Sequence, residues 1–351
     1  MIRRRPVLAV LPALACGGAF GLPLRTLQFP RDHGAHPDLR TEWWYVTGFL
    51  SGGGREFGFQ LTFFRSRVDA AQGLASRFAA RQLVFAHAAL TDVQGRRLWH
   101  DQRIAREGFG VAVAETSDTR VRLRDWHLSR GADGVYAGRL ASEAFGLDLR
   151  FSPTQPLLLQ GRDGLSRKGP DESQASYYYS VPQLAARGQV TLQGRRFEVA
   201  GKGWLDHEWS EALMHPDAVG WDWIGMNLDD GSALAAFQLR RRDGSALWDG
   251  GSFRSSSTAR PVIAEAGRTR FTARRHWTSP LSGARYPVEW SVTTPSGEYT
   301  VRAVVDAQEL DSRASTGAIY WEGLSDLLDR EGRRVGRGYL EMTGYAQRLR
   351  L

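Results

Sequence analysis

The feature of this sequence that most restricts its fold is an internal repeat that relates the two halves of the chain. Residues 43–61 align without a gap with residues 221–239, and each segment reads as an aromatic strand, a glycine turn and a return strand. The identical pairs are Trp43/Trp221, Leu50/Leu228, Gly53/Gly231, Phe59/Phe237, Gln60/Gln238 and Leu61/Leu239. Unrelated hairpins share turn glycines and alternation, whereas the paired tryptophans favour duplication. We therefore predict two homologous β-domains that meet within residues 180–189.

Apolar and polar residues alternate along many short segments, which is the pattern of strands with one buried face. The clearest of these segments are residues 57–63, 120–124 and 145–151. Glycine-rich turns separate the strands, which predicts antiparallel sandwiches or barrels. Helical periodicity is weak and is limited to short candidates at residues 66–80 and 324–328. A barrel of about eight strands has room for one small ligand, and pockets also favour domain interfaces.

The N-terminus has the layout of a secretory signal. Arginines at positions 3–5 precede an uncharged apolar run over residues 6–15, which is too short to span a bilayer. Cys16, the only cysteine, ends a segment that resembles the lipobox of bacterial lipoproteins, with Ala13 where leucine is usual. We expect residues 1–21 to be a signal peptide and the protein to be exported to the periplasm. Plain cleavage and lipidation of Cys16, which would anchor the protein to a membrane, both stay open.

Composition excludes several classes of function. A mature body without cysteine has no disulfide, cysteine nucleophile or thiolate metal site. The formal net charge of +8 includes three charges in the signal, and scattered arginines without a binding motif argue against nucleic acid. His33 and His36 would suit a metal on a helix, but Gly34 and Pro37 oppose one, so we expect turn or capping roles. We predict no metal and no cofactor, and the sequence identifies no export or transport system as a partner.

The densest group of reactive side chains lies in residues 203–209, Gly-Trp-Leu-Asp-His-Glu-Trp. On a strand, Asp206 and Glu208 share one face and His207 points to the other. Neighbouring carboxylates raise one another's pKa, and an acid that stays protonated near neutral pH is what acid catalysis requires. We therefore name Asp206, His207 and Glu208 as catalytic candidates. The alternative is a structural corner satisfied by hydrogen bonds, because burying these groups unpaired costs several kcal/mol.

A second set of residues is expected to line a ligand pocket. Aromatic clusters that include an acid occur at residues 42–45 and again at 220–223. His87 is a lone polar residue in an apolar strand, and the three tyrosines at 177–179 straddle another strand. Such residues are more often packed in a core than in contact with a ligand, so the structural alternative stays open. The ligand-binding candidates are Glu42, Trp43, Tyr45, His87, Tyr178, Trp204, Trp209, Trp221, Asp222 and Trp223.

These motifs together resemble the AttH-like secreted proteins, a group similar to the carotenoid 1,2-hydratases and, more distantly, to kievitone hydratase and lipocalin-like Diels–Alderases. The resemblance covers essentially the whole mature chain and rests on residues 29–37, 41–45, 85–87, 178–180, 204–210 and 220–223. It implies an all-β protein of two lipocalin-like antiparallel β-barrel domains in tandem, in agreement with the repeat. We place these domains at residues 22–185 and 186–351.

The resemblance also implies an activity, the addition of water to an isoprenoid double bond. In the hydratases an acid protonates the alkene, aromatic rings shelter the carbocation, and water attacks. His207 and Trp209 match that family's site, but the following strand offers Gln238 where the family has an acid. A neutral amide cannot protonate an alkene, so the acid here would be Asp206, Glu208 or Asp222.

Two classes of function remain open, and in both the partner is a small apolar ligand. One is a hydro-lyase, or an isomerase- or cyclase-type enzyme, acting on a hydrophobic substrate. The other is a non-catalytic periplasmic carrier of a lipid or another apolar ligand. An acid that faces the cavity favours the enzyme, whereas acids fully occupied by hydrogen bonds from indoles and arginines favour the carrier.

Overall fold

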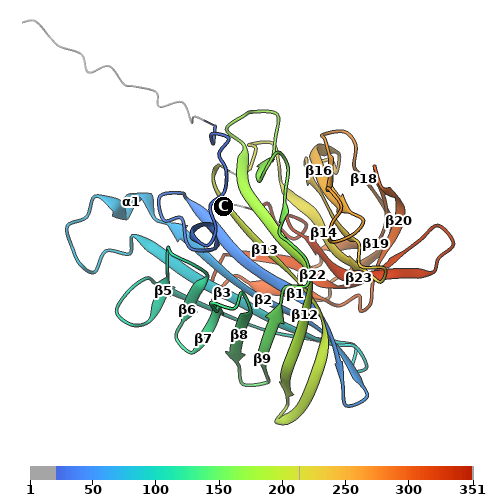
Figure 1. The fold of residues 1–351 in the computed structure, drawn as a ribbon, viewed down its shortest axis with the longest axis horizontal. Helices are drawn as coiled ribbons and strands as arrows, with labels where there is room; N and C mark the ends of the chain where they lie inside the picture. Colours follow the sequence, from blue (N-terminus) through green and yellow to red (C-terminus); the bar gives the residue numbers. More distant parts are fainter. Residues whose placement is uncertain (1–20, 213, 350–351) are drawn as a thin grey trace, which may run out of the picture.

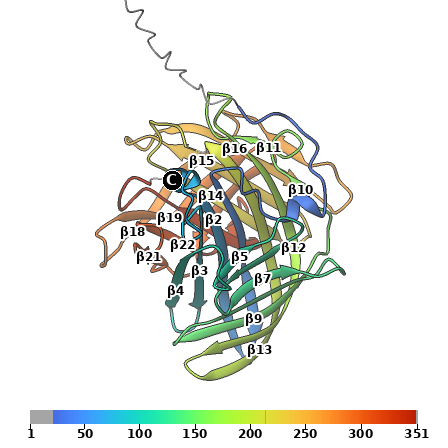
Figure 2. The same ribbon diagram turned by 90° about the vertical axis from the view of Figure 1, so that its left-hand side faces the viewer.

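The structure, a computed structural model, describes residues 21–212 and 214–349 and consists almost entirely of antiparallel strands. Strands β1–β13 form one sheet and β14–β23 a second (Figures 1 and 2). Each sheet curls around its own core, which confirms the all-β class and the two tandem lipocalin-like barrels. Residues 1–20 of the expected signal peptide, including Cys16, lie outside the described residues. Within the described ranges, no helix has the length and apolar character needed to cross a membrane.

Two short helical elements accompany the first sheet, η1 (Arg31–His33) before its first strand and α1 (Asp69–Gln72) between β2 and β3. Its strands are β1 (Thr41–Gly52), β2 (Arg55–Arg67), β3 (Gln82–Asp92), β4 (Arg97–Arg106), β5 (Ala112–Ala114), β6 (Arg120–Leu123), β7 (Trp126–Arg130), β8 (Tyr136–Ala141), β9 (Phe145–Ser152), β10 (Leu158–Leu159), β11 (Leu165–Arg167), β12 (Ala175–Leu192) and β13 (Arg195–Ala212). The strands of the second sheet are β14 (Gly220–Leu228), β15 (Ala233–Arg240), β16 (Ala246–Arg254), β17 (Val262–Ala264), β18 (Arg270–Thr278), β19 (Arg285–Thr294), β20 (Gly297–Ala303), β21 (Glu309–Ser312), β22 (Ala318–Leu328) and β23 (Arg334–Met342).

The two sheets repeat one strand order. The first runs β4-β3-β2-β1-β13-β12-β9-β8-β7-β6-β5, and the second runs β17-β16-β15-β14-β23-β22-β20-β19-β18. In each sheet the opening strand therefore lies between the second strand and the last one. This arrangement places Trp43 and Trp221 on equivalent strands, as the repeat predicts.

The hairpin register differs between the two halves. Trp43 opposes Phe64, whereas Trp221 opposes Leu239, which the gap-free alignment matches with Leu61. The reason is the turn, because β1 and β2 are joined by Gly53 and Gly54 alone and β14 and β15 by the longer loop 229–232. The repeat therefore extends to strand order and not to the pairing of the return strand.

The sheets divide between Ala212 and Gly220, later in the chain than the expected boundary at 185/186. That position falls inside β12, whose neighbours β13 and β9 both belong to the first sheet. The helical turn expected within 66–80 is present as α1. The candidate at 324–328 is wrong, because these residues complete β22 and pair with β23.

A third apolar cluster fills part of the space between the sheets and includes Tyr45, Trp204, Trp223, Leu324 and Tyr339. The strands that meet there, β1, β13, β14 and β23, are consequently buried on both faces. Alternate side chains of one such strand enter its own barrel, while the others face the opposite sheet. The candidate site lies where the side chains that face the opposite sheet meet.

Candidate functional site

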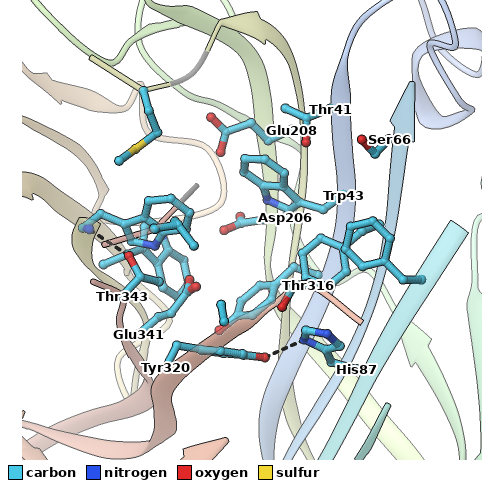
Figure 3. Close-up of a pocket in the computed structure, with 18 of the residues that line it drawn as sticks. Thr41, Trp43, Ser66, His87, Asp206, Glu208, Thr316, Tyr320, Glu341 and Thr343 are labelled. Carbon is cyan, nitrogen blue, oxygen red and sulfur yellow. Dashed lines mark hydrogen bonds between the residues drawn. The ribbon is translucent and has the colours of Figure 1, made fainter. Parts of the chain in front are cut away.

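A cavity of about 490 Å³ lies between the two sheets, and both sheets contribute to its walls. Figure 3 shows Trp43, Asp206 and Glu208 of the first sheet across the space from Tyr320 and Glu341 of the second. The volume suits a small organic ligand. The aromatic part of the wall consists of Trp43, Tyr45, Phe64, Phe85, Tyr178, Trp221, Trp223, Phe237 and Tyr320.

Strand pairing explains why polar groups converge on this cavity, because directly opposed residues project to the same side of a sheet. In the first sheet, Ser180, Asp206 and Tyr45 form one cross-strand row. In the second sheet, the corresponding row is Phe237, Trp223, Glu341 and Glu322. Two rows that each carry an acid among aromatic rings thus face one cavity.

Asp206 is 3% exposed and is held by three hydrogen-bond donors. Tyr178 Oη donates to Oδ2 at 2.7 Å, while Ser180 Oγ and Trp204 Nε1 donate to Oδ1 at 2.5 and 2.7 Å. Burial raises the pKa of Asp206 to about 7, the three hydrogen bonds oppose this rise, and negative charge on Glu208 adds to it. The carboxyl group therefore exchanges its proton near neutral pH.

Glu208 projects from the same face of β13 but has a different environment. Lys168 Nζ lies 3.0 Å from Glu208 Oε1, and the Ser176 hydroxyl donates to the same oxygen. The Lys168 ammonium also lies 4.3 Å from the centre of the Phe237 ring and 4.7 Å from that of Tyr178. Glu208 and Lys168 thus form a buried ion pair in the cavity wall.

His87 lines the cavity from β3 and is fully enclosed in a chain of hydrogen bonds. Its Nδ1 lies 2.8 Å from Tyr320 Oη, and its Nε2 lies 2.8 Å from Ser315 Oγ (Figure 3). Burial lowers the pKa of His87 to about 3, so the ring is neutral at pH 7. The Tyr320 hydroxyl also accepts a hydrogen bond from Gln60 Nε2 at 3.2 Å, which links His87 to the second sheet's acids.

The two acids of the second sheet were not among the sequence candidates. Gln60 Nε2 donates to Glu322 Oε2 at 2.7 Å, while Glu322 Oε1 is buried with no partner among the described residues. Burial and negative charge on Glu341 raise the pKa of Glu322 well above its usual range. Glu322 therefore favours its protonated form.

Glu341 lines the cavity, and its carboxyl accepts no hydrogen bond of good geometry from the described residues. Burial raises its pKa to about 7, the neighbouring Trp221 indole opposes this rise, and charges on Asp206 and Glu208 add to it. A carboxyl group with this pKa, which faces an aromatic cavity and has the Trp221 indole as a polar neighbour, is available to a bound molecule.

His207 points away from the cavity, into the first barrel, as the alternation of β13 requires. Its Nε2 lies 2.9 Å from Glu42 Oε1, and its ring stacks on Trp44 with 4.7 Å between the ring centres. Burial lowers its pKa to about 4, opposed by Glu42. His207, a catalytic candidate from the sequence, therefore does not line the cavity with Asp206 and Glu208, because neighbouring strand residues face opposite ways.

Glu42 and Trp209 belong to this interior network as well and do not line the cavity. His36 Nδ1 and Arg65 Nε lie 2.7 and 2.8 Å from the Glu42 carboxylate. The His36 ring is stacked on Trp209 at 4.0 Å. The ligand atoms of His36, Glu42 and His207 lie within 4.8 Å of one another, a separation that would suit a metal ion. Direct hydrogen bonds from both histidines and the ion pair with Arg65 instead occupy the Glu42 carboxylate.

Asp222 and Trp204 are also placed away from the cavity wall. Asp222 faces the second barrel, where it forms an ion pair with Arg240 at 2.8 Å and accepts hydrogen bonds from Gln238 and Tyr345. Trp204 lies behind Asp206 and donates its indole N–H to it. The remaining candidates do line the cavity, namely Trp43, Tyr45, His87, Tyr178, Trp221 and Trp223.

A two-barrel, lipocalin-like protein with an acid-containing cavity between its domains is the class that this fold and site define. Within that class, the chain belongs to the AttH-like family, whose model matches residues 21–345. It is similar to the crystal structure of an AttH from Nitrosomonas europaea, with 46% sequence identity and a TM-score of 0.85. The alignment covers 92% of this chain and 98% of that one.

More distant solved structures share the fold. Kievitone hydratase from Nectria haematococca is 11% identical with a TM-score of 0.68, over 92% of this chain and 96% of that chain. CghA, solved with Sch210972, is 12% identical with a TM-score of 0.52, over 87% of this chain and 88% of its own. No curated protein matches the chain.

Proposed function

We propose that this protein is an exported acid–base enzyme of the hydro-lyase type, which adds water to a double bond of an apolar, isoprenoid-like molecule in the cavity. The observation that carries the proposal is the Glu341 carboxyl group. It pairs across strands with Glu322, faces aromatic rings, and has a pKa of about 7 with no ion-pair partner among the described residues. An acid of this kind is matched to proton transfer near neutral pH.

In the proposed reaction, Glu341 is the acid, Asp206 is the base, and three tryptophans stabilise the cation. Glu341 donates its proton to one carbon of the double bond and becomes a carboxylate. The π-faces of Trp43, Trp221 and Trp223 stabilise the carbocation that forms on the other carbon. Water attacks this carbon, and Asp206 in its ionised form takes the released proton. A proton returning from Asp206 to Glu341 restores both groups, so water is the only co-reactant.

The neutral state of the acids also favours an apolar ligand. Ionised carboxylates in a low-dielectric cavity are unfavourable, and burial accordingly shifts Glu322 and Glu341 towards their protonated forms. With these groups neutral, the wall facing a ligand is mainly aromatic. A cavity wall that contains several acids is therefore still compatible with an apolar ligand.

A carrier is the second candidate, and one observation favours it. Asp206 and Glu208, the acids expected from the sequence, are occupied by hydrogen bonds and by Lys168. A site whose acids are all occupied in this way holds a ligand without protonating it. Glu341 is the residue that separates the two functions.

The test combines ligand capture with conversion. Native mass spectrometry of the purified protein should show a co-purifying apolar molecule. Incubation with an acyclic isoprenoid polyene should give a product one water heavier, and Glu341→Gln should retain binding while losing at least a hundredfold in rate. If wild type and Glu341→Gln bind equally and neither converts the polyene, the carrier function is correct. Glu265→Gln, at an exposed acid outside the cavity wall, is the matched control and should keep its activity.

A further inference from the structure

Four large apolar side chains are exposed together where α1 and its following loop meet the β4–β5 connection. Leu74, Phe78, Ile104 and Phe109 are 52%, 60%, 40% and 50% exposed. Phe78 and Phe109 stack with ring centres 5.4 Å apart, although they come from separate loops. Figure 1 shows α1 at the end of the molecule away from the second sheet. We call these four residues the apolar strip.

Arginines surround the apolar strip. The Arg106 guanidinium lies 4.1 Å from the centre of the Phe109 ring, and that of Arg77 lies 5.4 Å from the Phe78 ring. Arg81 donates a hydrogen bond to the Leu74 carbonyl, which ties the loop down. Among the described residues, none of these three arginines forms an ion pair with an acid. Their positive charge is consequently available to a partner.

The nearby acids do not cancel this charge. Asp69 on α1 is paired with Arg67 at 2.7 Å. Glu107 is half-buried and accepts a hydrogen bond from the Ala114 backbone at 3.3 Å. The surface around the stacked phenylalanines is thus both apolar and basic.

The apolar strip is continuous with the cavity. On β4, Ile104 and Arg106 lie on one face of the sheet, opposite Phe85 and Leu83 of β3. Ile104, Phe85 and Leu83 all line the cavity. The same sheet face therefore runs from the cavity wall out to the exposed residues, and Ile104 belongs to both.

We propose that the apolar strip, with Arg77, Arg81 and Arg106, is a docking surface for a membrane that contains anionic lipid, through which an apolar ligand passes into the cavity. Exposed aromatic rings insert at the level of the headgroups, and arginines pair with lipid phosphates. An apolar ligand avoids water if it leaves the bilayer beside an entrance of the same character. The docking surface does not depend on whether the ligand is then transformed.

Charge and ring geometry favour a lipid surface over a protein partner. Phe78 and Phe109 stand out from the sheet on loops, rather than forming a groove for another chain. The guanidinium groups beside them match phosphate in charge and in hydrogen-bonding geometry. The apolar strip is continuous with the cavity wall through Ile104, so a membrane bound there would lie beside the cavity.

Co-sedimentation with vesicles tests the proposal. The full chain carrying Cys16→Ser, which cannot be acylated, is mixed with phosphatidylcholine vesicles with or without phosphatidylglycerol. We expect binding to the anionic vesicles only, weakened by added salt. Phe78→Ser/Phe109→Ser should reduce the partition coefficient at least tenfold, and each of Arg77→Gln and Arg106→Gln about fivefold. Binding that does not depend on phosphatidylglycerol overturns the proposal.

Matched controls come from exposed residues of the second half. Val262→Ser/Leu281→Ser removes two apolar side chains that are 51% and 61% exposed, and Arg270→Gln removes an exposed arginine of β18. These variants should bind as wild type does, and a loss equal to that of the strip variants overturns the proposal. A dimer would also overturn the proposal. In that outcome, sedimentation velocity detects a dimer of the wild type that Phe78→Ser/Phe109→Ser converts to monomer, and the protein does not bind vesicles. If circular dichroism shows that the Phe78→Ser/Phe109→Ser variant is unfolded, the vesicle binding of the Arg77→Gln and Arg106→Gln variants tests the proposal instead.

Discussion

Glu322 on β22 and Glu341 on β23 are direct cross-strand partners, and both carboxyl groups face the cavity between the sheets. Two carboxylates in this relation repel one another, and the surrounding protein removes the water that would screen them. The pair therefore keeps at least one proton at neutral pH and titrates as a unit. This behaviour underlies the first two predictions.

The rate of polyene hydration should fall as the pH rises above about 7. Glu341 must be protonated to act, and above its pKa of about 7 the protonated fraction decreases about tenfold per pH unit. Glu208→Gln removes a negative charge that raises this pKa, so the falling limb should move to lower pH. Initial rates from pH 5 to 9 give both curves. A rate that rises across this range would exclude Glu341 as the acid.

Stability should respond to pH in the same region. The folded-state pKa of Glu341 lies above the ordinary value of 4.5 for glutamate, so its contribution to stability is fully present below about 4.5 and is lost as the pH rises through about 7. Glu341→Gln cannot ionise and should be more stable than wild type at pH 8.5 by about 1 to 3 kcal/mol, with no gain from this source near pH 4.5. Urea unfolding measures the difference, and the exposed Glu265→Gln should show none. A uniform change at both pH values would mean an effect of packing.

Glu42→Gln should destabilise the protein by about 3 to 5 kcal/mol while leaving ligand binding intact, because it leaves the buried Arg65 without its ion-pair partner. Burial raises the pKa of Glu42, but hydrogen bonds from His207 and His36 outweigh this effect and hold the pKa below its usual range. Glu298→Gln, which breaks an exposed pair with Arg330, should cost less than about 1 kcal/mol. If the variant has normal stability but no longer binds the ligand, Glu42 contributes to ligand binding after all.

Export predicts a shortened N-terminus. Mass analysis of the protein isolated from cells should show that the first 15 to 21 residues are absent. A diacylglycerol mass on Cys16 would identify a lipoprotein, and Cys16→Ser should then release it in soluble form. An intact Met1 in the mature protein would contradict export.

The faces of the strands and the equivalence of the two halves could be predicted further than the site could. The alternation in residues 203–209 correctly separates Asp206 and Glu208 from His207, and the repeat correctly makes Trp43 and Trp221 equivalent. However, β1 and β13 are buried on both faces, so hydrophobicity does not reveal which face meets the other sheet. For this reason the sequence predicts His207 as a catalytic residue and Glu42 as a ligand-binding residue, although both face the first barrel.

The sequence does contain a signal for Glu341. Glu341 is the lone acid of an apolar strand, as His87 is the lone histidine of another, whereas Glu322 shares β22 with Asp326. What makes them a pair is the register between β22 and β23, and their approach to Asp206 depends on how two sheets pack. Contacts of this kind join residues far apart in the chain, and a local pattern does not contain them.

The position of β1 beside β13 has a consequence for how the molecule is made. Thr41 finds its partner Ser210 only after most of the first sheet has been synthesised, so this sheet closes late and long-range pairing slows its folding. Until then the β1–β2 hairpin has an open edge that other chains can pair with. A gene cut at 185/186 would make that edge permanent, because it leaves β13 on the wrong fragment. Fragments intended to fold alone have to be separated between Ala212 and Gly220.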